Sequence, residues 1–365
     1  ARRGGRPPRQ PRLVSMLVVA CAIGAMRTKP TRPTKQKKAR YNGPPPIRPS
    51  CLNGTLPTPS VGLADDGLMH VAFFDTRPRP DTRAMLAAAQ QIRKAGGAEA
   101  LRFYVLLHPK LELQVPGMSR TPLSLPPAAQ CLFSGLARLA HGPGPAYLYK
   151  PLLHWLLPSV RRLILLDTDT VVLRPIAELW NHFRRFSGAV LGVANEQTNM
   201  YQRASGWTEV GKNGGVQLLD LHAMRASTEY NQVLERYASG AERRWIGFLG
   251  DQTLYTHLAS SRSPRQGGLV YTLPCEWNRQ ISMQFGFRNR TTHTCPRQCA
   301  LLHANFRPLK CVVGVMQGNP SCTTWRAFWQ RSAKEVKGTK RACGGTVKWN
   351  EFQRAVKDFF ADCCV

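Results

Sequence analysis

Short apolar runs of strand length alternate with amphipathic segments along the chain from residue 68 onward. Leu68–Thr76, Leu101–Leu107 and Leu163–Leu166 are apolar runs that favour buried β-strands. Between the first two lies Thr82–Gly97, which is rich in helix formers and ends in two glycines. A strand, a helix and a strand in this order predict a parallel sheet with right-handed crossovers.

The same alternation continues towards the C-terminus. Two further strands are expected at Ala189–Asn195 and Gly214–Leu221, and three helices at Tyr147–Leu157, Pro175–Phe186 and Ser227–Gly240. Ser124–Gln130 contains two adjacent prolines and is expected to be a loop. The chain is therefore predicted to be an α/β protein whose central sheet is mostly parallel and flanked by helices.

The first 66 residues show a different pattern. Residues 1–12 form a basic tail, and residues 13–26 form an uncharged apolar stretch of 14 residues. That length is short for a membrane span, which needs about 20 residues, and is typical of signal-peptide cores. We expect a signal-anchor, while a cleaved signal and an organelle transit peptide stay open as alternatives. Residues 27–66 are rich in Pro, Lys and Arg and are expected to form an extended stem.

Positive charge is concentrated in the same N-terminal part. The formal net charge is +30, and 13 of the 51 Lys and Arg residues lie within residues 1–48, before the first acidic residue, Asp65. No helix-turn-helix, zinc-finger or RNA-recognition pattern accompanies the charge, so we expect no nucleic-acid partner. Nucleotide sugars, acidic glycans and lipid head groups are anionic partners that fit a basic protein equally well.

The cysteines indicate an oxidising compartment. The chain has 11 of them, and an even number remains without Cys21 of the apolar stretch. Five fall between Cys275 and Cys322, which indicates disulfide bonds with the pairing left open. The sequences at Asn53 and Asn289 match the N-glycosylation pattern, which also favours the secretory route. The alternative to disulfides is a structural zinc site formed by four nearby residues: His293, Cys295, Cys299 and His303.

Two aspartates follow the apolar run at Leu163–Leu166. Because side chains alternate along a strand, Asp167 and Asp169 are expected to point to one side and Thr168 to the other. Carboxylates at the carboxyl end of a sheet strand lie where open α/β sheets bind ligands, and their oxygens suit Mg²⁺ or Mn²⁺. The alternative is that one or both only cap the following turn.

The same stretch also fits the opening motif of haloacid dehalogenase-type phosphatases. In that class Asp167 would be a nucleophile and Asp169 a general acid/base. Such enzymes need a further acidic pair downstream for Mg²⁺, and no two adjacent acidic residues follow Asp169. The motif also lies about 100 residues into the part expected to fold, so this reaction stays a secondary alternative.

Four further stretches follow the aspartates in a fixed order. They are NGGVQLLDL (Asn213–Leu221), GDQTLYTHLA (Gly250–Ala259), LPCEWNRQ (Leu273–Gln280) and LLHANFRPLK (Leu301–Lys310), after YKPLLHWLLPSVRRLILLDTDTVVLRPIAELW (Tyr149–Trp180). The ordered set resembles glycosyltransferase family 8, in particular the LARGE-type xylosyltransferase domain and the glucoside xylosyltransferases. The resemblance implies a GT-A fold, an α/β nucleotide-sugar-binding sheet, over residues 67–312. A Cys-rich C-terminal extension at residues 313–365 lies beyond the resemblance.

The resemblance also implies a metal site and a reaction. Asp167, Asp169 and His303 correspond to the family's three protein ligands for Mn²⁺, with Mg²⁺ as the alternative ion. A UDP-sugar would be the donor, and transfer would retain the configuration of the sugar. Asp251 would grip hydroxyls of the donor sugar, and Gln252 would lie beside the anomeric carbon. Because an amide is a poor nucleophile, this pattern favours same-face attack through a short-lived ion pair over a double displacement.

Donor binding is implied for a larger set of residues. Lys150 would reach the sugar or its phosphates, and the glycines of the NGGV segment would form the floor of the sugar site. The family usually has a basic residue six positions after the histidine. This chain has Leu309 there, so Arg307 or Lys310 would have to clasp the diphosphate. The full donor-binding set is Lys150, Thr168, Asn213, Gly214, Gly215, Asn305, Arg307 and Lys310.

The sequence thus predicts a retaining, Mn²⁺-dependent glycosyltransferase that moves xylose from a UDP-sugar to a glycan or glycoprotein acceptor. UDP-glucose, UDP-galactose and UDP-glucuronate stay open as donors, and an inactive glycan-binding family member stays open as well. We expect a single-pass type II protein of the Golgi or endoplasmic reticulum membrane with a lumenal catalytic domain. A secreted or organellar protein is the alternative. No function is assigned to residues 313–365.

Overall fold

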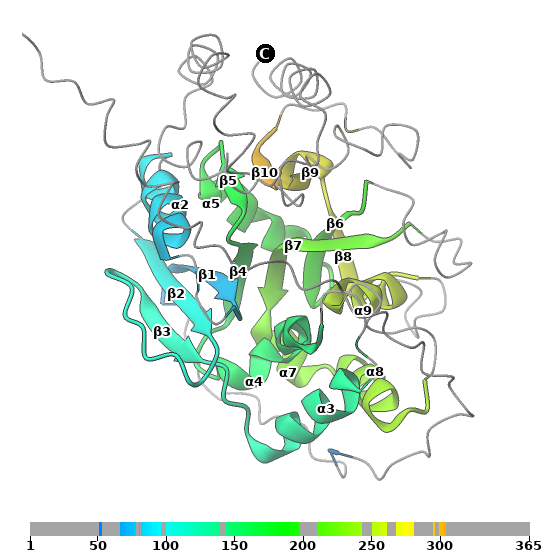
Figure 1. Ribbon diagram of the computed structural model, residues 1–365. Helices are drawn as coiled ribbons and strands as arrows, with labels where there is room; N and C mark the ends of the chain where they lie inside the picture. Colours follow the sequence, from blue (N-terminus) through cyan, green and yellow to red (C-terminus); the bar gives the residue numbers. More distant parts are fainter. Residues whose placement is uncertain are drawn as a thin grey trace, which may run out of the picture.

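The computed structural model describes residues 51–52, 66–77, 80, 82–95, 100–138, 140, 144–197, 210–242, 250–260, 268–280, 295 and 299–303 (Figure 1). The expected basic tail, the apolar segment 13–26, most of the stem and the C-terminal extension lie outside these ranges. Within the described ranges, no helix combines the length and the apolar composition that a membrane crossing requires.

A seven-stranded sheet forms the centre of the described structure (Figure 1), with the strand order β3-β2-β1-β4-β7-β6-β8. Neighbours within β3-β2-β1-β4 are parallel, as are β6 and β8, whereas β7 runs antiparallel to β4 and β6. The predicted, mostly parallel sheet is therefore confirmed. The strands are β1 (Met69–Asp75), β2 (Leu101–Leu107), β3 (Ser119–Pro122), β4 (Arg162–Asp167), β6 (Leu191–Asn195), β7 (Lys212–Asp220) and β8 (Val270–Leu273).

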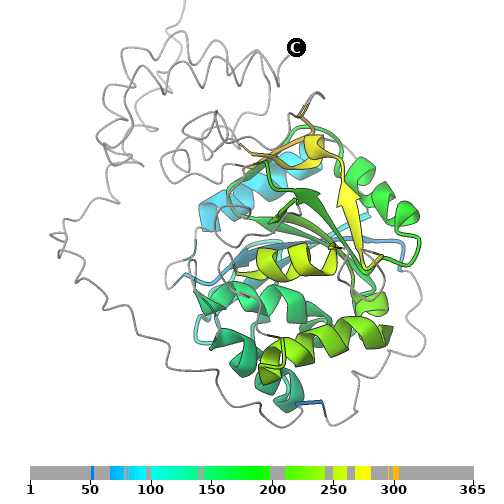
Figure 2. The same ribbon diagram turned by 90° about the vertical axis from the view of Figure 1, so that its right-hand side faces the viewer.

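Alternate side chains of the central strands enter two separate hydrophobic cores. On β4, Leu163 and Leu165 belong to a core shared with α3, α4, α8 and α9, whereas Ile164 and Leu166 belong to one shared with α2 and α5. Helices therefore cover both faces of the sheet (Figure 2), which explains why the strand runs are apolar throughout. The α-helices are α2 (Thr82–Lys94), α3 (Pro127–Ala137), α4 (Leu153–Leu156), α5 (Ile176–Trp180), α7 (Leu221–Ala226), α8 (Thr228–Ser239) and α9 (Asp251–Leu258), and the 3₁₀ helices are η2 (Pro145–Leu152), η3 (Asn181–Arg185) and η4 (Cys275–Asn278).

A second, three-stranded sheet joins distant segments of the chain. It contains β5 (Thr170–Val172), β10 (Leu301–His303) and β9 (Arg279–Gln280), with β10 in the middle. β10 pairs antiparallel with β5, so that His303 lies opposite Thr170, and parallel with β9, so that His303 lies beside Gln280. This register brings the end of β10 next to the turn that follows β4.

Two sequence-based element predictions need correction. Ser124–Gln130 is not a loop throughout, because α3 begins at Pro127. A proline in the first helical turn has a suitable φ and lacks only an N–H that would have no partner within the helix. The helix expected at Tyr147–Leu157 is mostly the 3₁₀ helix η2, which passes into the short α4. Pro151 lies inside η2 and lacks the N–H that a regular α-helix needs there.

The boundaries of α8 agree with the prediction. The side chain of Ser227 accepts a hydrogen bond from the backbone N–H of Tyr230, which caps the first turn. At the other end, Gly240 adopts the left-handed conformation, with φ of 86°, that closes many helices. The capping serine and the terminal glycine could both be recognised in the sequence, and they set the two ends of α8.

Disulfide bonds replace the zinc alternative. Two are described in full, Cys51–Cys131 and Cys275–Cys295, and Cys299 is disulfide-bonded as well. Cys295 and Cys299 are therefore not available as thiolate ligands, and the zinc interpretation of their spacing is wrong. The expectation of disulfides is confirmed, and the structure supplies two of the pairs that the sequence left open.

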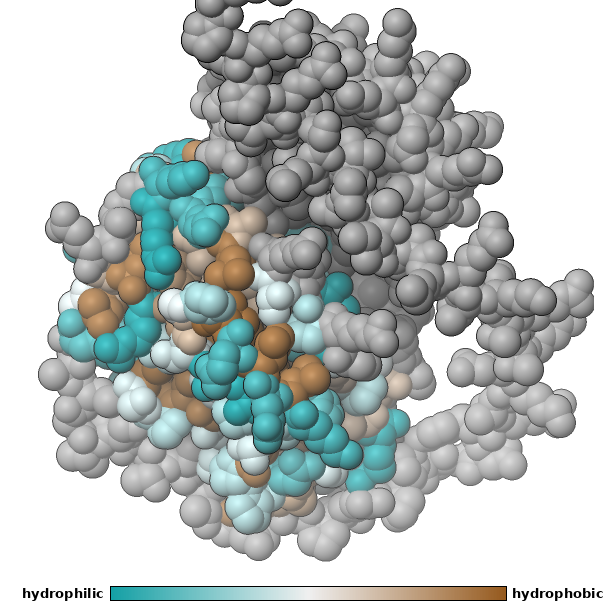
Figure 3. All heavy atoms as spheres, turned by 60° about the vertical axis from the view of Figure 1, so that its left-hand side comes forward, coloured by the Kyte–Doolittle hydropathy of each residue, from teal (hydrophilic) through white to brown (hydrophobic). Residues whose placement is uncertain are grey.

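Nearly all large apolar side chains of the described residues are buried or half-buried. Hydrophilic and hydrophobic side chains are interspersed on the face shown in Figure 3. Among the large hydrophobic side chains of the described residues, that of Val210 is the exposed one. The apolar residues of the strands thus pack into the two hydrophobic cores, one on each face of the seven-stranded sheet.

Candidate functional site

Three side chains that can bind a metal ion converge where β4 ends. Asp167 is the last residue of β4, Asp169 lies in the turn that leads into β5, and His303 is the last residue of β10. The Nε2 atom of His303 lies 3.5 Å from a carboxylate oxygen of Asp169 and 3.9 Å from one of Asp167. One ligand atom from each residue lies within 4.8 Å of the other two. The structure therefore brings the three predicted metal ligands together.

The two aspartates converge for a different reason than strand alternation. β4 ends at Asp167, so Asp169 is not part of the strand, and the chain turns between them. The hydroxyl of Thr170 donates to the backbone carbonyl of Asp167 at 2.8 Å, which closes this turn. Pairing of β5 with β10 then sets the turn against His303. The convergence therefore depends on a turn and on a long-range strand pair.

The donor set of this cluster fits a divalent cation. Two carboxylates and one imidazole nitrogen suit Mn²⁺, whereas Mg²⁺ prefers an all-oxygen set. Asp169 and His303 are buried, while the side chain of Asp167 remains 22% exposed. A ligand such as a diphosphate could therefore approach the cluster from the side of Asp167.

Lys150 is a buried cation next to the cluster. Its Nζ atom donates to Asp167 Oδ1 at 2.7 Å and lies 3.9 Å from Asp251 Oδ2. Burial disfavours the charged ammonium group, but the two carboxylates outweigh this effect and raise the pKa of Lys150 above its ordinary value. The rings of Phe74 and Tyr147, with centroids 5.4 Å and 5.2 Å away, also favour the charge. Lys150 is thus a fixed positive charge that links two of the predicted site carboxylates.

Asp251 is a buried carboxyl group at the first position of α9. Burial raises its pKa to about 6, although the charge of Lys150 and a hydrogen bond from Gln217 act in the opposite direction. Gln217 Nε2 donates to Asp251 Oδ2 at 2.9 Å, and the hydroxyl of Tyr255 donates to Gln217 Oε1 at 2.9 Å. Because Tyr255 engages the amide oxygen, Gln217 presents its N–H group to Asp251. The carboxylate is thereby held in one orientation.

Two glycines of β7 make room for the site side chains. A Cβ atom on Gly215 would overlap the imidazole ring of His303, and one on Gly214 would lie 2.7 Å from Asp251 Oδ2. The carbonyl of Gly214 also accepts a hydrogen bond of 3.1 Å from Lys150 Nζ. The groups that approach these glycines include His303 and Asp251, and the predicted approach of a donor sugar stays a prediction.

Asn213 and Gln252 contact protein groups. Asn213 Nδ2 donates to Glu196 Oε2 at 2.9 Å, while its Oδ1 accepts from the backbone of Gly215 at 3.0 Å and from Asn278 Nδ2 at 2.9 Å. Gln252 Oε1 accepts a hydrogen bond of 3.1 Å from the backbone N–H of Gly214. The predicted contacts of both residues with a donor sugar stay predictions.

The remaining predicted donor-binding residues are placed only in part. Thr168 lies in the turn between the two aspartates. Asn305, Arg307 and Lys310 lie outside the described residues, so their contacts with a diphosphate stay predictions.

Several polar residues of the site were not singled out from the sequence. Asp75 ends β1, one residue beyond the pair that Phe74 forms with Asp167, and its carboxylate binds the guanidinium group of Arg77. Asp75 follows an apolar strand as Asp167 does, so the same pattern could have indicated it. Asn278 lies in the LPCEWNRQ stretch, but only the fold shows what its amide contacts. The residues not singled out are Asp75, Glu196, Gln217 and Asn278.

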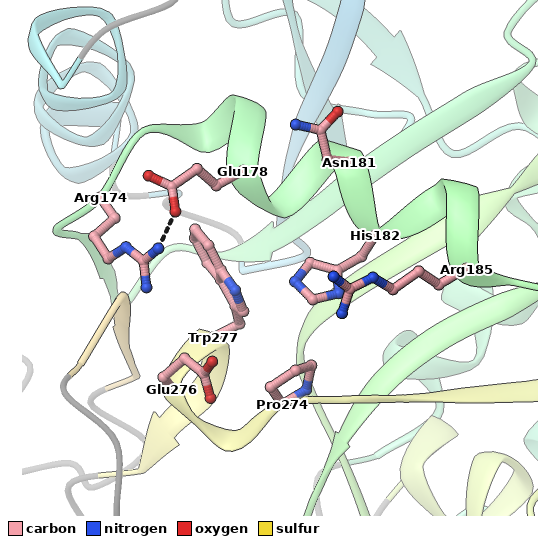
Figure 4. Close-up of a pocket in the computed structure, with 8 residues that line it drawn as sticks. All are labelled: Arg174, Glu178, Asn181, His182, Arg185, Pro274, Glu276 and Trp277. Carbon is pink, nitrogen blue, oxygen red and sulfur yellow. Dashed lines mark hydrogen bonds and ion pairs between the residues drawn. The ribbon is translucent and has the colours of Figure 1, made fainter.

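A separate cavity of about 290 Å³ lies among α5, η3 and η4. Figure 4 shows Arg174 ion-paired with Glu178 on one side and Arg185 on the other, with Trp277 between them. The guanidinium carbon of Arg174 lies 5.5 Å from the centroid of the Trp277 ring. The residues that line the cavity include no member of the predicted metal cluster, so the cavity is distinct from the cluster.

Known proteins resemble this chain in the region of the site. Residues 138–306 match the family model described as Glycosyl transferase family 8. Human xylosyl- and glucuronyltransferase LARGE1 is 33% identical over 149 residues, which cover 39% of this chain and 18% of that protein. Mouse xyloside xylosyltransferase 1 is 33% identical over 151 residues, which cover 35% of this chain and 37% of that protein. The chain thus spans well under half the length of either relative.

The fold is shared with a solved structure. The crystal structure of the apo form of mouse xyloside xylosyltransferase 1 superposes with a TM-score of 0.51 at 21% identity, covering 65% of this chain and 97% of that one. The predicted GT-A fold is therefore confirmed. The family match also replaces the phosphatase interpretation of the same aspartates. Residues 138–306 thus match a family 8 glycosyltransferase domain, and the chain is similar to xylosyltransferases.

Proposed function

We propose that this protein is a retaining glycosyltransferase that uses a UDP-sugar and a divalent cation, with Mn²⁺ as the favoured ion. The proposal rests on the cluster of Asp167, Asp169 and His303 at the carboxyl end of a central strand. Open α/β sheets bind their ligands at such strand ends. The cluster lies inside the segment that matches family 8, and Lys150 and Asp251 lie beside it.

Each group has a role in the proposed reaction. Asp167, Asp169 and His303 would hold the cation, which when bound supplies positive charge for the leaving diphosphate. Lys150 adds a fixed positive charge beside Asp167. Asp251, a buried acceptor, binds hydroxyl groups of the donor sugar. The next residue, Gln252, is an amide and therefore a poor nucleophile, which favours same-face attack by the acceptor hydroxyl through a short-lived ion pair.

Xylose is the sugar that we propose. Both relatives carry xylosyl transfer in their names, and LARGE1 is also named a glucuronyltransferase. UDP-glucuronate is therefore the second donor to test, before UDP-glucose and UDP-galactose. The acceptor is proposed to be a hydroxyl group of a glycan or glycoprotein.

Donor hydrolysis tests the proposed activity and names the sugar. We expect release of UDP from UDP-xylose that requires Mn²⁺ and is lost on chelation. Asp169→Asn keeps the side-chain size but removes one negative charge from the cluster, so the rate should fall about 100-fold or more while the circular dichroism stays that of the wild type. Glu178→Gln, at an exposed ion pair outside the cluster, is the matched control and should retain the wild-type rate.

Two outcomes would contradict the proposal. Full Mn²⁺-dependent activity of Asp169→Asn would remove the metal assignment. Binding of UDP-sugars without turnover of any donor or acceptor would favour an inactive glycan-binding protein instead.

We also propose where the domain lies and where the protein works. The catalytic domain would span residues 67–312, with residues 13–26 as a type II signal-anchor and the catalytic part in the lumen of the Golgi or endoplasmic reticulum. Two described disulfides support an oxidising compartment. A change in electrophoretic mobility after treatment with an N-glycosidase would support the lumenal location, and an unglycosylated cellular protein would count against it.

A further inference from the structure

We propose that Asn278 is a positioning residue that fixes the tautomer of His303 through a directed chain of hydrogen bonds beginning at Glu196. The chain runs from Glu196 to Asn213, from Asn213 to Asn278, and from Asn278 to the imidazole ring. This inference rests on the proposed function and deepens it, because the tautomer of His303 matters only if His303 binds the metal ion. The chain itself is a property of the metal-free protein.

A backbone donor sets the direction of the later hydrogen bonds. The backbone N–H of Gly215 can only donate, and it lies 3.0 Å from Asn213 Oδ1. Asn213 therefore turns its Nδ2 group towards Glu196 Oε2, 2.9 Å away. Its oxygen also accepts from Asn278 Nδ2 at 2.9 Å.

The second amide passes this direction on to the imidazole. Because Asn278 donates with its nitrogen, its Oδ1 atom faces His303 Nδ1, 3.1 Å away. An amide oxygen can only accept, so Nδ1 must carry the hydrogen. In a neutral imidazole the lone pair is then on Nε2, which is the nitrogen that faces Asp167 and Asp169. His303 is thereby held in the tautomer that can bind a cation.

Without this chain the cluster would favour the other tautomer. The two carboxylates near Nε2, at 3.5 Å and 3.9 Å, attract a hydrogen on that nitrogen, where it would block a metal ion. The chain offsets that attraction before any ion arrives. Partners that orient a metal-binding histidine in this way typically change metal affinity by about 10–100-fold when they are removed.

Burial keeps the chain intact. The side chains of Glu196, Asn213, Asn278 and His303 are all buried, so water cannot readily take the place of a missing partner. Gln197, the residue after Glu196, also contacts the segment that contains Asn278. Its Nε2 atom donates to the carbonyl of Asn278 at 3.2 Å, and its Oε1 atom accepts from the backbone N–H of Gln280 at 3.2 Å. Hydrogen bonds thus join the segment that follows β6 to η4 and β9.

The tautomer can be measured without metal. We would label the histidine side chains with ¹⁵N and record their nitrogen spectra in the metal-free full chain at pH 8, with His303→Gln to identify the signal of this residue. Wild-type protein should show a hydrogen on Nδ1 and a lone pair on Nε2. Asn278→Leu, which is similar in size but has no acceptor, should move the hydrogen to Nε2 or give a mixture of both forms.

A conservative variant separates positioning from packing. Asn278→Asp retains an acceptor for Nδ1 and should restore the wild-type tautomer, although it cannot donate to Asn213. In the same preparations, the Mn²⁺ affinity should be about 10–100-fold lower for Asn278→Leu and closer to wild type for Asn278→Asp.

Either of two results would overturn the inference: a wild-type His303 with its hydrogen on Nε2, or an Asn278→Leu variant that folds and keeps the wild-type tautomer. The first does not need Asn278→Leu, so the test does not depend on whether that variant folds. If the tautomer responds as expected but no variant, wild type included, binds Mn²⁺, the hydrogen-bond chain is supported and the proposed function fails.

Discussion

At the scale of single residues, burial alters the protonation of groups beyond the metal cluster. It raises the pKa of Asp251 to about 6, lowers that of Lys212 to about 8 and lowers that of His154 to about 3. His154 is fully buried among η2, α4 and α8, where its Nε2 atom lies 3.3 Å from Asn231 Oδ1. The amide nitrogen of Asn231 donates to two backbone carbonyls, so its oxygen faces the histidine as an acceptor.

His154 should make the folded state sensitive to acid. Its pKa is about 3 in the folded protein, against about 6.5 for an ordinary histidine, so the unfolded chain takes up a proton first as the pH falls. The contribution of His154 is thus fully present above pH 6.5 and is lost as the pH falls towards 3. Between pH 7 and pH 5 the loss should be about 2 kcal/mol.

Urea unfolding of the wild type and of His154→Gln at both pH values measures this loss. The glutamine can still donate to Asn231 but does not titrate, so the free energy of unfolding should fall by about 2 kcal/mol less in the variant. His108→Gln, at an exposed position, is the control and should behave as the wild type does. Equal pH dependence in all three proteins would show that His154 is not held neutral.

The residue scale also separates what sequence could and could not reveal about the site. Asp167, Asp169 and His303 were predicted because carboxylates and an imidazole stand out in a run of ordered motifs. Glu196 and Asn278 were not, because their importance comes from hydrogen bonds between segments distant in sequence. A single asparagine in a 3₁₀ helix gives no recognisable sequence pattern. The role of Asn278 can be inferred only from its hydrogen bond to His303 in the folded structure.

At the scale of elements, strands with long apolar runs were predictable and short ones were not. Most residues of β1, β2 and β4 are buried, and each strand contains an unbroken run of apolar residues that pack on both faces of the sheet. β5 and β10 have three residues each, too few to show a period, and their pairing is set by the rest of the fold. The pairing of β5 with β10 nevertheless places His303 beside Asp167 and Asp169.

The close approach of β7 to β10 gives a prediction at this scale. A methyl group on Gly215 would overlap the ring of His303, so in Gly215→Ala either the imidazole or the nearby backbone has to shift, and we expect the imidazole to leave its position beside Asp167 and Asp169. We expect the affinity for Mn²⁺ to fall by about tenfold or more, since an indirect partner alone is worth about 10–100-fold. Calorimetric titration of the metal into the purified full chain measures it.

Gly192→Ala is the matched control for this substitution. Gly192 lies in the neighbouring strand β6, where a Cβ atom would come within 3.1 Å of the Phe186 ring and 3.3 Å of Leu218 Cβ but would not meet His303. It should lower thermal stability without changing metal affinity. An unchanged affinity in Gly215→Ala would mean that the backbone of β7 or β10 can yield, and that the glycine is not needed for the cluster.

At the scale of the whole molecule, the two described disulfides close loops of different length in different places. Cys51–Cys131 joins residues 80 positions apart and ties the segment at residue 51 to α3. Cys275–Cys295 joins residues 20 positions apart and holds the first residue of η4, the helix that ends at Asn278. One bond therefore lies far from the metal cluster along the chain, and the other anchors the element that orients His303.

Removing the two bonds should thus have separable effects. Chain entropy predicts that the long loop contributes about 4.5 kcal/mol and the short one about 3 kcal/mol to the free energy of unfolding. The double variant Cys51→Ser with Cys131→Ser should therefore lose more stability in urea but bind Mn²⁺ as the wild type does. Cys275→Ser with Cys295→Ser should lose less stability, yet bind Mn²⁺ more weakly, because η4 is freed at one end. If the metal affinity fell equally in both, the weakening would reflect general loosening of the fold, and η4 would not be the link between the disulfide and the histidine.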